Sequence, residues 1–306
     1  MTGQDVQLEA AGERPGVPLV SIIVRTMGRP ELFEALASLA AQSWERIEAV
    51  VVDARGTPPV ELPARCGRFP LRAVRRGRPL ARSAAGNAGL EAAAGDFIGF
   101  LDEDDLVDAD HVAGLVGLLL DHPEAVAAYA RVRCEGDEAL SAWLSRPFSR
   151  TWLALGNYIP IHAALFRRGA LDRGCRLDET LDVYEDWDLW LQLVRHGDFV
   201  RLDRVTAAYR AGGSSGAGLA GDPAVMRAGR ERILAKWKAL WSGSELEAIL
   251  AECAAQMRRL EAVEAELARE RAARAELAHT LELVQGSWSW KATAWLRRLA
   301  ALARRR

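Results

Sequence analysis

The stretch Gly95-Asp96-Phe97-Ile98-Gly99-Phe100-Leu101-Asp102-Glu103-Asp104-Asp105 joins an apolar segment to four consecutive acidic residues. The apolar segment has the length and composition of a buried strand, and the acids follow where that strand would end. An open α/β sheet presents ligands at the carboxyl ends of its strands. Neighbouring carboxylates repel one another unless a cation or a positive partner compensates their charge. The local sequence leaves two interpretations open, a metal site and a solvated acidic turn that caps the next helix.

The residues before this stretch repeat the same pattern of an apolar run followed by polar residues. Residues 19–24 (Leu-Val-Ser-Ile-Ile-Val) form a continuous apolar run, typical of a parallel strand covered on both faces. Pro30 opens an amphipathic helix, and a second strand over residues 47–52 ends at Asp53. A helix of small residues over 82–95 then leads to the acidic stretch. These βαβ units predict an α/β fold.

Composition divides the chain into five segments. A Gly- and Ser-rich stretch after the last predicted strand (residues 199–209) is the clearest boundary. We predict a disordered lead-in (1–18), an α/β domain (19–211), a flexible linker (212–222), a helical and coiled-coil extension (223–285) and a basic amphipathic tail (286–306).

The helical extension has apolar residues at seven-residue spacing, from Leu246 to Leu281. The pattern is interrupted at Gln256, Glu270 and Arg274, and a single surface helix is the competing interpretation. The heptad pattern favours a short coiled coil, so we expect a homo-oligomer formed through residues 245–285.

The tail combines aromatic and basic residues. Trp288, Trp290 and Trp295 alternate with lysine and arginine, and no acidic residue follows Glu282. This composition is typical of an interfacial membrane helix, and the competing interpretation is a helix that packs back onto the protein. We expect peripheral membrane contact through residues 286–306.

Overall composition restricts the class of protein. The chain has 306 residues, of which 50% are apolar, and a formal net charge of −2, so no basic field indicates nucleic acid as a partner. Its four cysteines are scattered without zinc-site spacing. The sequence shows no secretory signal, and its longest apolar run, residues 112–120, is too short to span a bilayer. We expect a cytoplasmic protein, which the tail would bring to the inner face of the cell membrane.

Five segments in order resemble a family 2 inverting glycosyltransferase with the GT-A fold. They are Val20-Ser21-Ile22-Ile23-Val24, Val50-Val51-Val52-Asp53, Arg82 to Asn87, Phe100 to Asp105, and Glu185-Asp186-Trp187. The resemblance covers roughly residues 19–210. It implies a Rossmann-like, mixed and mainly parallel sheet flanked by helices, followed by the helical extension.

The resemblance assigns the acidic stretch to the donor, a nucleotide-diphosphate sugar. In this family the Asp-x-Asp motif serves the metal and the ribose, which implies a Mn²⁺ or Mg²⁺ site at Asp102 and Asp104, with Asp104 as the direct ligand. Hard cations prefer carboxylate oxygen and neutralise a departing diphosphate. Glu103 is expected to contact the ribose, and Asp105 to cap or orient.

The resemblance also implies that Asp186 is the catalytic base, with Glu185 orienting the acceptor or the base and Trp187 packing below. A carboxylate within hydrogen-bond reach can take the proton of the attacking hydroxyl. The competing interpretation of Glu185-Asp186 is the acidic first turn of a helix, which the helix dipole favours.

Six further residues are expected at the donor site by resemblance. They are Arg25, Thr26, Asp53, Arg82, Asn87 and His162. Ala54 stands where the family usually has a second acid, and this departure weakens the inference of a uridine nucleotide.

The leading hypothesis is therefore a metal-dependent inverting glycosyltransferase. Its acceptor would be a hydroxyl of a glycan, a lipid-linked molecule or a protein, as in cell-surface polysaccharide synthesis. The alternative is a non-catalytic GT-A-like binding or scaffold module in a surface-glycan assembly complex. A sugar-nucleotidyltransferase would need a Gly-rich phosphate loop, of which residues 25–30 are a poor version.

Overall fold

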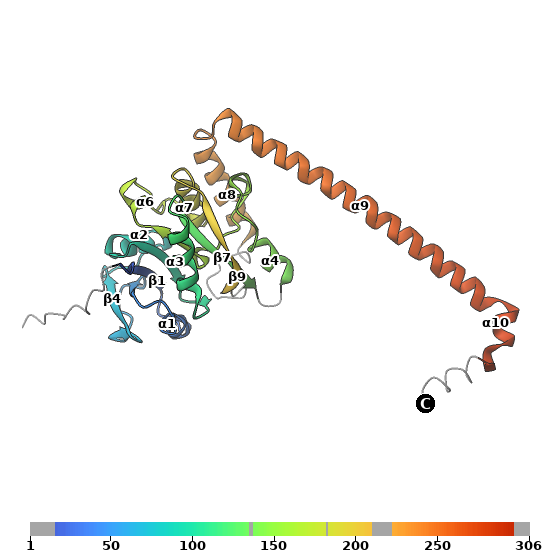
Figure 1. Ribbon diagram of the computed structural model, residues 1–306, viewed down its shortest axis with the longest axis horizontal. Coiled ribbons are helices and arrows are strands. Elements are labelled where there is room, and N and C mark those ends of the chain that lie inside the picture. The colour runs from blue at the N-terminus through green and yellow to red at the C-terminus, as the bar shows by residue number, and fades with distance from the viewer. Residues whose placement is uncertain (1–15, 135–136, 182, 210–221, 297–306) are drawn as a thin grey trace, which may run out of the picture. The chain divides into compact units, whose positions relative to one another are not determined.

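A computed structural model describes residues 16–134, 137–181, 183–209 and 222–296 (Figure 1). Most of the predicted lead-in, nearly all of the predicted linker and the last ten residues of the tail lie outside the described residues. The chain divides into two compact units, the first ending at Ser242 and the second beginning at Gly243. Each unit is described by itself.

The elements follow one another in an alternating order. The strands are β1 (Val20–Thr26), β2 (Ile47–Asp53), β3 (Arg65–Cys66), β4 (Phe69–Arg75), β5 (Phe97–Asp102), β6 (Leu106–Val107), β7 (Ala127–Cys134), β8 (Ala164–Arg167) and β9 (Phe199–Tyr209). The helices are α1 (Leu32–Ala40), α2 (Arg82–Ala92), α3 (His111–Asp121), α4 (Glu138–Trp143), α5 (Arg150–Leu155), the 3₁₀ helix η1 (Ile161–Ala163), α6 (Gly169–Asp172), α7 (Glu185–Leu193), α8 (Pro223–Trp237), α9 (Gly243–Gly286) and α10 (Trp288–Ala292).

The strands of the first unit form one mixed sheet, in the order β3-β4-β2-β1-β5-β8-β7-β9-β6. The segment β4-β2-β1-β5 is parallel, whereas β8 runs antiparallel to both of its neighbours. In the described residues, parallel and antiparallel strand pairs alternate through the second half of the sheet. The carboxyl ends of β1 and β5 lie side by side, with Arg25 opposite Asp102. The predicted mixed α/β sheet is confirmed.

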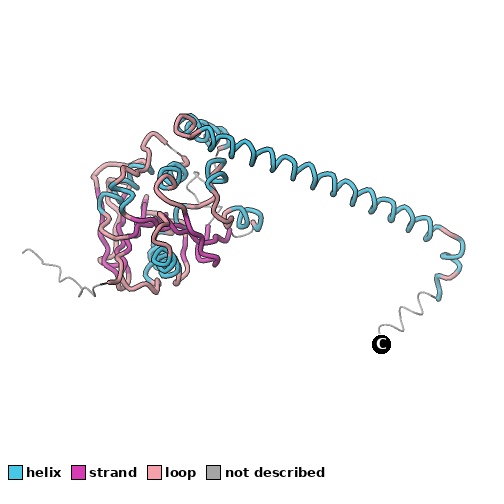
Figure 2. The backbone as a smooth tube through the Cα atoms, turned by 45° about the horizontal axis from the view of Figure 1, so that its top comes forward, coloured by secondary structure: helices cyan, strands magenta, loops and turns pink. Residues whose placement is uncertain are grey.

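Helices cover both faces of this sheet, which gives three layers (Figure 2). Residues of α2, α7 and α8 share one buried cluster with one face of the sheet. Residues of α1 and α3 share a second cluster with the other face. The apolar runs of β1 and β2 are buried along their whole length because each strand contributes side chains to both clusters.

The small residues of α2 allow it to lie close to the sheet. A Cβ atom on Gly89 would lie 2.3 Å from Cγ2 of Ile23 in β1, so a larger side chain does not fit there. The helix predicted over residues 82–95 is shorter in the structure, because α2 ends at Ala92 with an extended residue after it. This close packing fixes the position of Arg82, the first residue of α2, relative to the end of β1.

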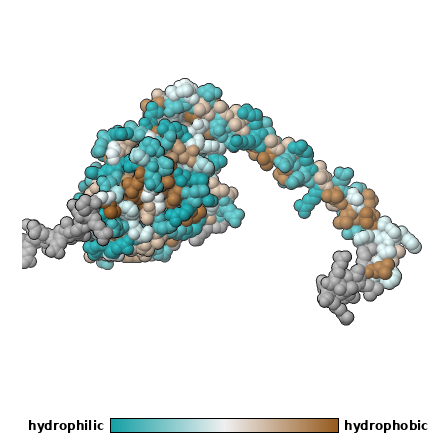
Figure 3. Space-filling model, viewed as in Figure 1, coloured by the Kyte–Doolittle hydropathy of each residue, from teal (hydrophilic) through white to brown (hydrophobic). Residues whose placement is uncertain are grey.

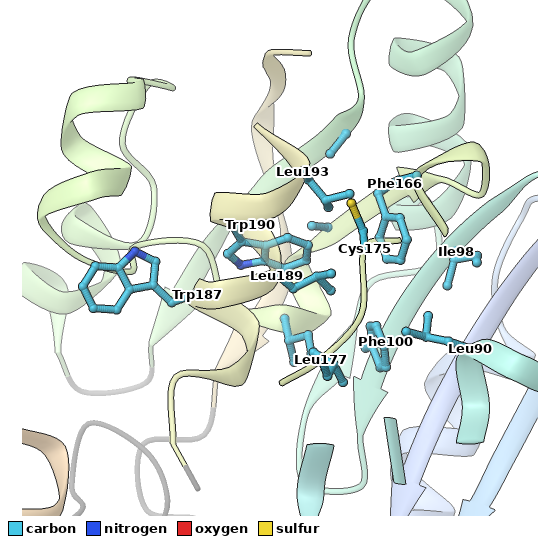
Figure 4. Close-up of a cluster of buried hydrophobic side chains, with 14 of the residues drawn as sticks. Leu90, Ile98, Phe100, Phe166, Cys175, Leu177, Trp187, Leu189, Trp190 and Leu193 are labelled. Carbon is cyan, nitrogen blue, oxygen red and sulfur yellow. The ribbon is translucent and has the colours of Figure 1, made fainter. Parts of the chain in front are cut away.

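Helix α7 is the largest contributor of buried aromatic side chains on its face. Trp187 and Trp190 are fully buried, and Trp190 meets Phe166 of β8 edge to face at 6.5 Å between ring centroids (Figure 4). Each indole N–H donates to a backbone carbonyl, of Leu153 and Ile159 respectively. The residues at the start of α7 are therefore carried by a helix that is anchored in the core.

Helix α8 belongs to the first unit, although the sequence interpretation grouped residues 223–285 in one extension. Ile233 and Trp237 of α8 are buried in the cluster that contains α7. The Nε1–H of Trp237 donates to Asp188 Oδ1 at 2.8 Å, and Lys236 Nζ lies 2.9 Å from Asp188 Oδ2. A fully buried aspartate in α7 thus joins the two helices by a charged and a neutral donor.

The second unit consists of α9 and α10 in the described residues, so the predicted helical extension is confirmed. Helix α9 ends at Gly286, as expected, and contains no buried residue. Apolar side chains reach its surface along much of its length, as the brown patches in Figure 3 show. Among the described residues, no helix combines the length and the apolar character needed to cross a membrane. The coiled coil and the membrane contact stay predictions.

Candidate active site

A hollow of about 760 Å³, a volume that includes open solvent, lies where β1, β5 and α7 meet. A second hollow of about 490 Å³ adjoins it, and Arg25, Arg82 and Asp102 line both. We call the first the α7 lobe, since it contains Glu185 and Asp186. The second is the β1 lobe, which contains Thr26, Met27, Arg29, Glu103 and Asp104. The two lobes meet at the end of the parallel part of the sheet.

Arg25 lies at the centre of the two lobes and is buried. Its Nε and Nη2 donate to the two oxygens of Asp102, at 2.7 and 2.8 Å, and its Nη1 donates to Glu185 Oε1 at 3.0 Å. Burial opposes ionisation of Asp102, but the charges of Arg25 and Arg82 outweigh it and lower the pKa of this carboxyl. Arg25 therefore joins the ends of β1 and β5 to the start of α7.

Glu103 is buried, and its carboxylate accepts hydrogen bonds from the end of β1 and from the loop that follows. Thr26 Oγ1 donates to it at 2.5 Å, and the backbone N–H groups of Met27 and Arg29 donate at 3.1 Å each. The Arg29 side chain adds an ion pair at 3.5 Å. Charge-assisted hydrogen bonds of this kind hold a loop firmly. Glu103 therefore fixes the loop that lines the β1 lobe.

Asp104 is the next residue and is less well compensated. Its closest cation is Arg29, with Nη1 at 3.7 Å. Burial and the negative charges of Asp105 and Asp102 raise the pKa of the Asp104 carboxyl. Within the described residues, no three His, Cys, Asp or Glu side chains cluster so that they could hold a metal ion by themselves. Asp104 thus faces the β1 lobe as a carboxylate that a cation would stabilise.

Asp105 and His162 form a buried pair in the wall of the α7 lobe. The two side chains approach within 2.8 Å, at His162 Nδ1 and Asp105 Oδ2. Burial opposes protonation of His162, but the charge of Asp105 outweighs it and raises the pKa of the imidazole. Its ring stacks on Tyr209 at 6.3 Å between centroids. His162 thus lies in the wall of the α7 lobe, where it pairs with one acid of the cluster.

Glu185 and Asp186 form the first turn of α7. Asp186 Oδ2 accepts from Asn157 Nδ2 at 2.7 Å, and Oδ1 accepts from the N–H of Trp187 at 2.8 Å. Burial and the neighbouring charge of Glu185 nevertheless raise the pKa of Asp186 to about 7. Glu185 is tied to Arg25, whereas Asp186 is held only by neutral donors among the described contacts. Asp186 can therefore exchange a proton near neutral pH.

Tyr184, the residue before this pair, sets the direction in which α7 starts. Its φ of 65° is the only positive φ among the described residues other than glycine. Gly229 of α8 packs against it: a Cβ atom there would lie 2.3 Å from Val183 Cγ2 and 3.2 Å from Tyr184 Cδ2. Met226, one turn earlier in α8, lines the α7 lobe. Helix α8 therefore supports the segment that carries Asp186.

Two of the residues predicted for the donor site are not brought into either lobe. Asp53 is buried, and its oxygens accept from the N–H groups of Arg55, Gly56 and Val60 in the following loop. The amide of Asn87 pairs with the backbone of Leu177, in both directions at 2.9 and 3.0 Å. The contacts of Asp53 and Asn87 are those of residues that fix loops.

Arg82, by contrast, lies where both lobes meet. It approaches Asp102 at 3.7 Å and Glu185 at 3.8 Å, and its side chain is 31% exposed. These contacts are too long for firm hydrogen bonds, so its charge is available to a ligand.

Sequence reasoning missed three residues at the site. Asn157 binds Asp186, Arg29 is the cation nearest to Asp104, and Tyr184 carries the left-handed backbone turn. Asn157 lies in a segment without a readable pattern. Arg29 could have been found, because it follows β1 in the same loop as Arg25 and Thr26.

The fold and site define a class of protein. The structure resembles Staphylococcus aureus TarS residues 1–349 in complex with UDP-GlcNAc, with a TM-score of 0.54 at 18% identity over 64% of this chain and 60% of that one. It also resembles the mannosyltransferase PcManGT of Pyrobaculum calidifontis in complex with GDP-Man and Mn²⁺, with a TM-score of 0.51 at 19% identity over 81% and 83%. The fold is that of the GT-A glycosyltransferases.

The sequence comparison is more specific. The model of the family "Glycosyl transferase family 2" matches residues 21–176, just over half of the chain, so the protein belongs to glycosyl transferase family 2. The Bacillus subtilis protein YwdF, described as an uncharacterized glycosyltransferase, is 26% identical over 62% of this chain and 72% of its own length. The uncharacterized protein y4gI of Sinorhizobium fredii is 28% identical over 76% of this chain, which spans only 27% of y4gI. Asp186 lies beyond the matched family region.

Proposed function

We propose that the protein is an inverting glycosyltransferase that moves a sugar from a nucleoside-diphosphate sugar to a hydroxyl group. One observation carries this proposal: Asp186 lines the α7 lobe with a pKa raised to about 7, in a fixed position. A general base works best when its pKa lies near the working pH. Family membership supports the donor class.

The reaction is a single in-line displacement. Asp186 accepts the proton of the acceptor hydroxyl, whose oxygen forms a bond to the anomeric carbon of the sugar. The bond from that carbon to the diphosphate oxygen breaks, and its electron pair leaves with the nucleoside diphosphate. Asn157 and the Trp187 N–H keep the Asp186 carboxylate oriented while it is charged. Inversion follows because the acceptor attacks from the face opposite the leaving group.

The diphosphate would lie in the β1 lobe, beside Arg82 and Asp104. The raised pKa of Asp104 supports a place for a divalent cation there, since an additional positive charge would relieve its repulsion from Asp105 and Asp102. Mg²⁺ is commonly held by one or two carboxylates together with substrate phosphates, so one protein ligand is compatible with such a site. When bound, this cation supplies neutralising charge for the departing diphosphate. Both oxygens of Asp102 accept from Arg25, which makes Asp104 the principal ligand in this proposal.

Release of the free nucleotide from a panel of UDP-, GDP- and dTDP-sugars, which would release a diphosphate, and of CMP-sugars, which would release CMP, with and without Mn²⁺, tests this function. We expect one nucleoside-diphosphate sugar to be turned over in a metal-dependent way, and Asp186→Asn to abolish that turnover. No turnover of any donor would favour the scaffold module instead, and turnover unchanged by both Asp104→Asn and Asp186→Asn would overturn the proposed roles of these two acids.

The tail supports an acceptor at a membrane surface. Trp288 is 86% and Trp295 61% exposed, and Lys291 lies between them. Aromatic and basic residues together favour the interface of an anionic bilayer. Co-sedimentation with liposomes containing anionic lipid tests this contact. Binding that is unchanged after deletion of residues 286–306 would reject it, and the donor assay would be unaffected by that result.

A further inference from the structure

Helix α9 carries an apolar stripe that is open to solvent. In the seven-residue pattern that begins at Leu246, the two inward positions between residues 260 and 284 hold Leu260, Val263, Leu267, Glu270, Arg274, Leu277, Leu281 and Val284. The six apolar members are between 43% and 71% exposed. Apolar surface of this extent on a soluble chain usually marks an interaction site.

The order of these eight residues is symmetric about its centre. Three apolar residues precede Glu270, and three apolar residues follow Arg274. Reversing the direction of the helix keeps apolar residues in the outer six places and exchanges the acid with the base. A stripe with this symmetry is complementary to a second copy of itself that runs the opposite way.

We propose that α9 pairs with α9 of a second copy of this chain as an antiparallel coiled coil centred at the level of residue 272. In this register Leu260 lies opposite the partner's Val284, Val263 opposite the partner's Leu281, and Leu267 opposite the partner's Leu277. Glu270 lies opposite the partner's Arg274, and Arg274 lies opposite the partner's Glu270. Each of the two central layers therefore holds one pair of opposite charges. This inference does not depend on the proposed function.

Other antiparallel registers lose this match. A shift of seven residues in one direction places Glu270 opposite the partner's Leu281 and Arg274 opposite the partner's Leu277. A shift in the other direction places Glu270 opposite the partner's Leu267 and Arg274 opposite the partner's Val263. Each shift buries four unpaired charges per dimer, which is strongly unfavourable. Polar residues at inward positions are a known means of fixing register.

The parallel arrangement is disfavoured for the same reason. It places Glu270 opposite the partner's Glu270 and Arg274 opposite the partner's Arg274, so like charges meet inside the coil. At its exposed edges the parallel arrangement forms two kinds of ion pair, Arg259 with the partner's Glu264 and Glu266 with the partner's Arg271. Exposed pairs contribute little, so the buried layers decide the direction. The antiparallel pair has one exposed repulsion, between Arg271 and the partner's Arg271.

Charge reversal tests the pairing in the full chain. By light scattering at about 50 μM we expect a mass near twice the 33.5 kDa of one chain. Glu270→Arg or Arg274→Glu alone should weaken the dimer roughly tenfold or more, since each leaves buried like charges. The double variant Glu270→Arg with Arg274→Glu restores opposite charges and should dimerise like the original chain. Since α9 has no buried residue, these changes leave the first unit folded.

Matched reversals on another face of the helix serve as controls. Arg269→Glu and Glu276→Arg are the same chemical changes at positions that point away from the proposed seam. They should leave the dimer mass unchanged. A monomer mass for the original chain over the whole concentration range would overturn the proposal and would favour a different partner for the stripe.

Cysteine cross-linking tests the direction. In a Cys253→Ser background, Leu267→Cys chains mixed with Leu277→Cys chains should form a disulfide between the two variants, and neither variant should cross-link alone. In the antiparallel register two copies of residue 267 are separated by ten residues of helix, about 15 Å, too far for a disulfide. Cross-linking of Leu267→Cys chains with one another would indicate a parallel pair and would contradict the proposal.

Discussion

Two pairs of neighbouring acids, Glu103-Asp104 after β5 and Glu185-Asp186 at the start of α7, differ in the same way within each pair. The first acid is buried and bound by groups of the protein: Glu103 by Thr26 and two backbone N–H groups, and Glu185 by Arg25. The second acid lines the same lobe as the first, and burial together with a neighbouring carboxylate raises its pKa.

The difference indicates a division of roles. A carboxylate that the protein already neutralises holds loops and helix ends in place, and its charge is not available to a ligand. A carboxylate left under-compensated gains most from a bound partner, which under the proposed function would be a cation at Asp104 and a proton at Asp186. Loss of a first acid should therefore affect stability most, and loss of a second acid should affect turnover most.

The largest effect on turnover outside α7 is expected for Asp104→Asn. Because the proposed cation at Asp104 would contribute several kcal/mol to the departure of the diphosphate, turnover should fall roughly 100-fold or more, and the response to added Mn²⁺ should disappear. A titration of turnover against metal concentration measures both quantities. Asp121→Asn, at an exposed position of α3, is the matched control and should behave like the original chain.

Glu103→Gln should act on stability instead. The change removes a charge that accepts from Thr26, Met27 and Arg29, and charge-assisted hydrogen bonds of this kind contribute about 1.5–3 kcal/mol each. We expect the free energy of unfolding in urea to fall by roughly 1–3 kcal/mol, since the amide keeps one acceptor. If the Glu103→Gln variant were as stable as the Asp121→Asn variant, the structural role assigned to the first acid of this pair would be contradicted.

The pH dependence of kcat/KM follows from Asp186. Only the deprotonated carboxylate can accept a proton, so kcat/KM should rise about tenfold per pH unit below the pKa of about 7 and level off above it. The free energy of unfolding changes in the opposite direction. Because the fold favours the protonated form of Asp186, its contribution to stability is present at acid pH and is lost as pH rises through about 7.

Asn157→Ala sharpens the pH prediction. Asn157 donates to Asp186 Oδ2 at 2.7 Å and so stabilises the charged form. Without it the midpoint of the kcat/KM profile should move to higher pH. A profile that is flat between pH 5.5 and 8.5 in the original chain, or a midpoint that Asn157→Ala leaves in place, would be inconsistent with Asp186 as the base.

The smallest effect is expected for Gly229→Ala. The added methyl group would meet Val183 at 2.3 Å and displace the segment through Tyr184 that carries the second pair of acids. We expect kcat to fall a few-fold with little change in KM, as for a residue that positions the base. Gly117→Ala in α3, where nothing lies within 4 Å, is the control and should slightly stabilise the chain.

The strands were predictable because their signal is local. The apolar runs of β1 and β5 in the sequence overlap the strands of the structure, and β9 has the predicted bounds, residues 199–209. Short elements such as β3 and β6 carry two residues each and give no periodic signal. Helix α8 was placed in the wrong unit because its three buried residues, Gly229, Ile233 and Trp237, are few in a polar helix.

The sequence predicted part of the membership of the candidate site, but it did not predict the contacts. The resemblance brought Arg25, Asp102 and Glu185 to one place, and the structure agrees with that placement. The bond between Arg25 and Glu185 joins residues 160 positions apart, and no pattern in a single sequence encodes such a contact. The same distance effect hides the role of Asn87, whose side chain pairs with the backbone of Leu177, 90 positions away.

The central claim is that Asp186 takes the proton while other residues bind the donor, and Asp186→Asn tests it most directly. The measurement is turnover of the accepted donor at pH 8, together with donor affinity by calorimetry on the same samples. We predict a loss of turnover of roughly 100-fold or more at nearly unchanged donor affinity, because a general base contributes about 10²- to 10⁴-fold to the rate. Turnover within a few-fold of the original chain would contradict the account.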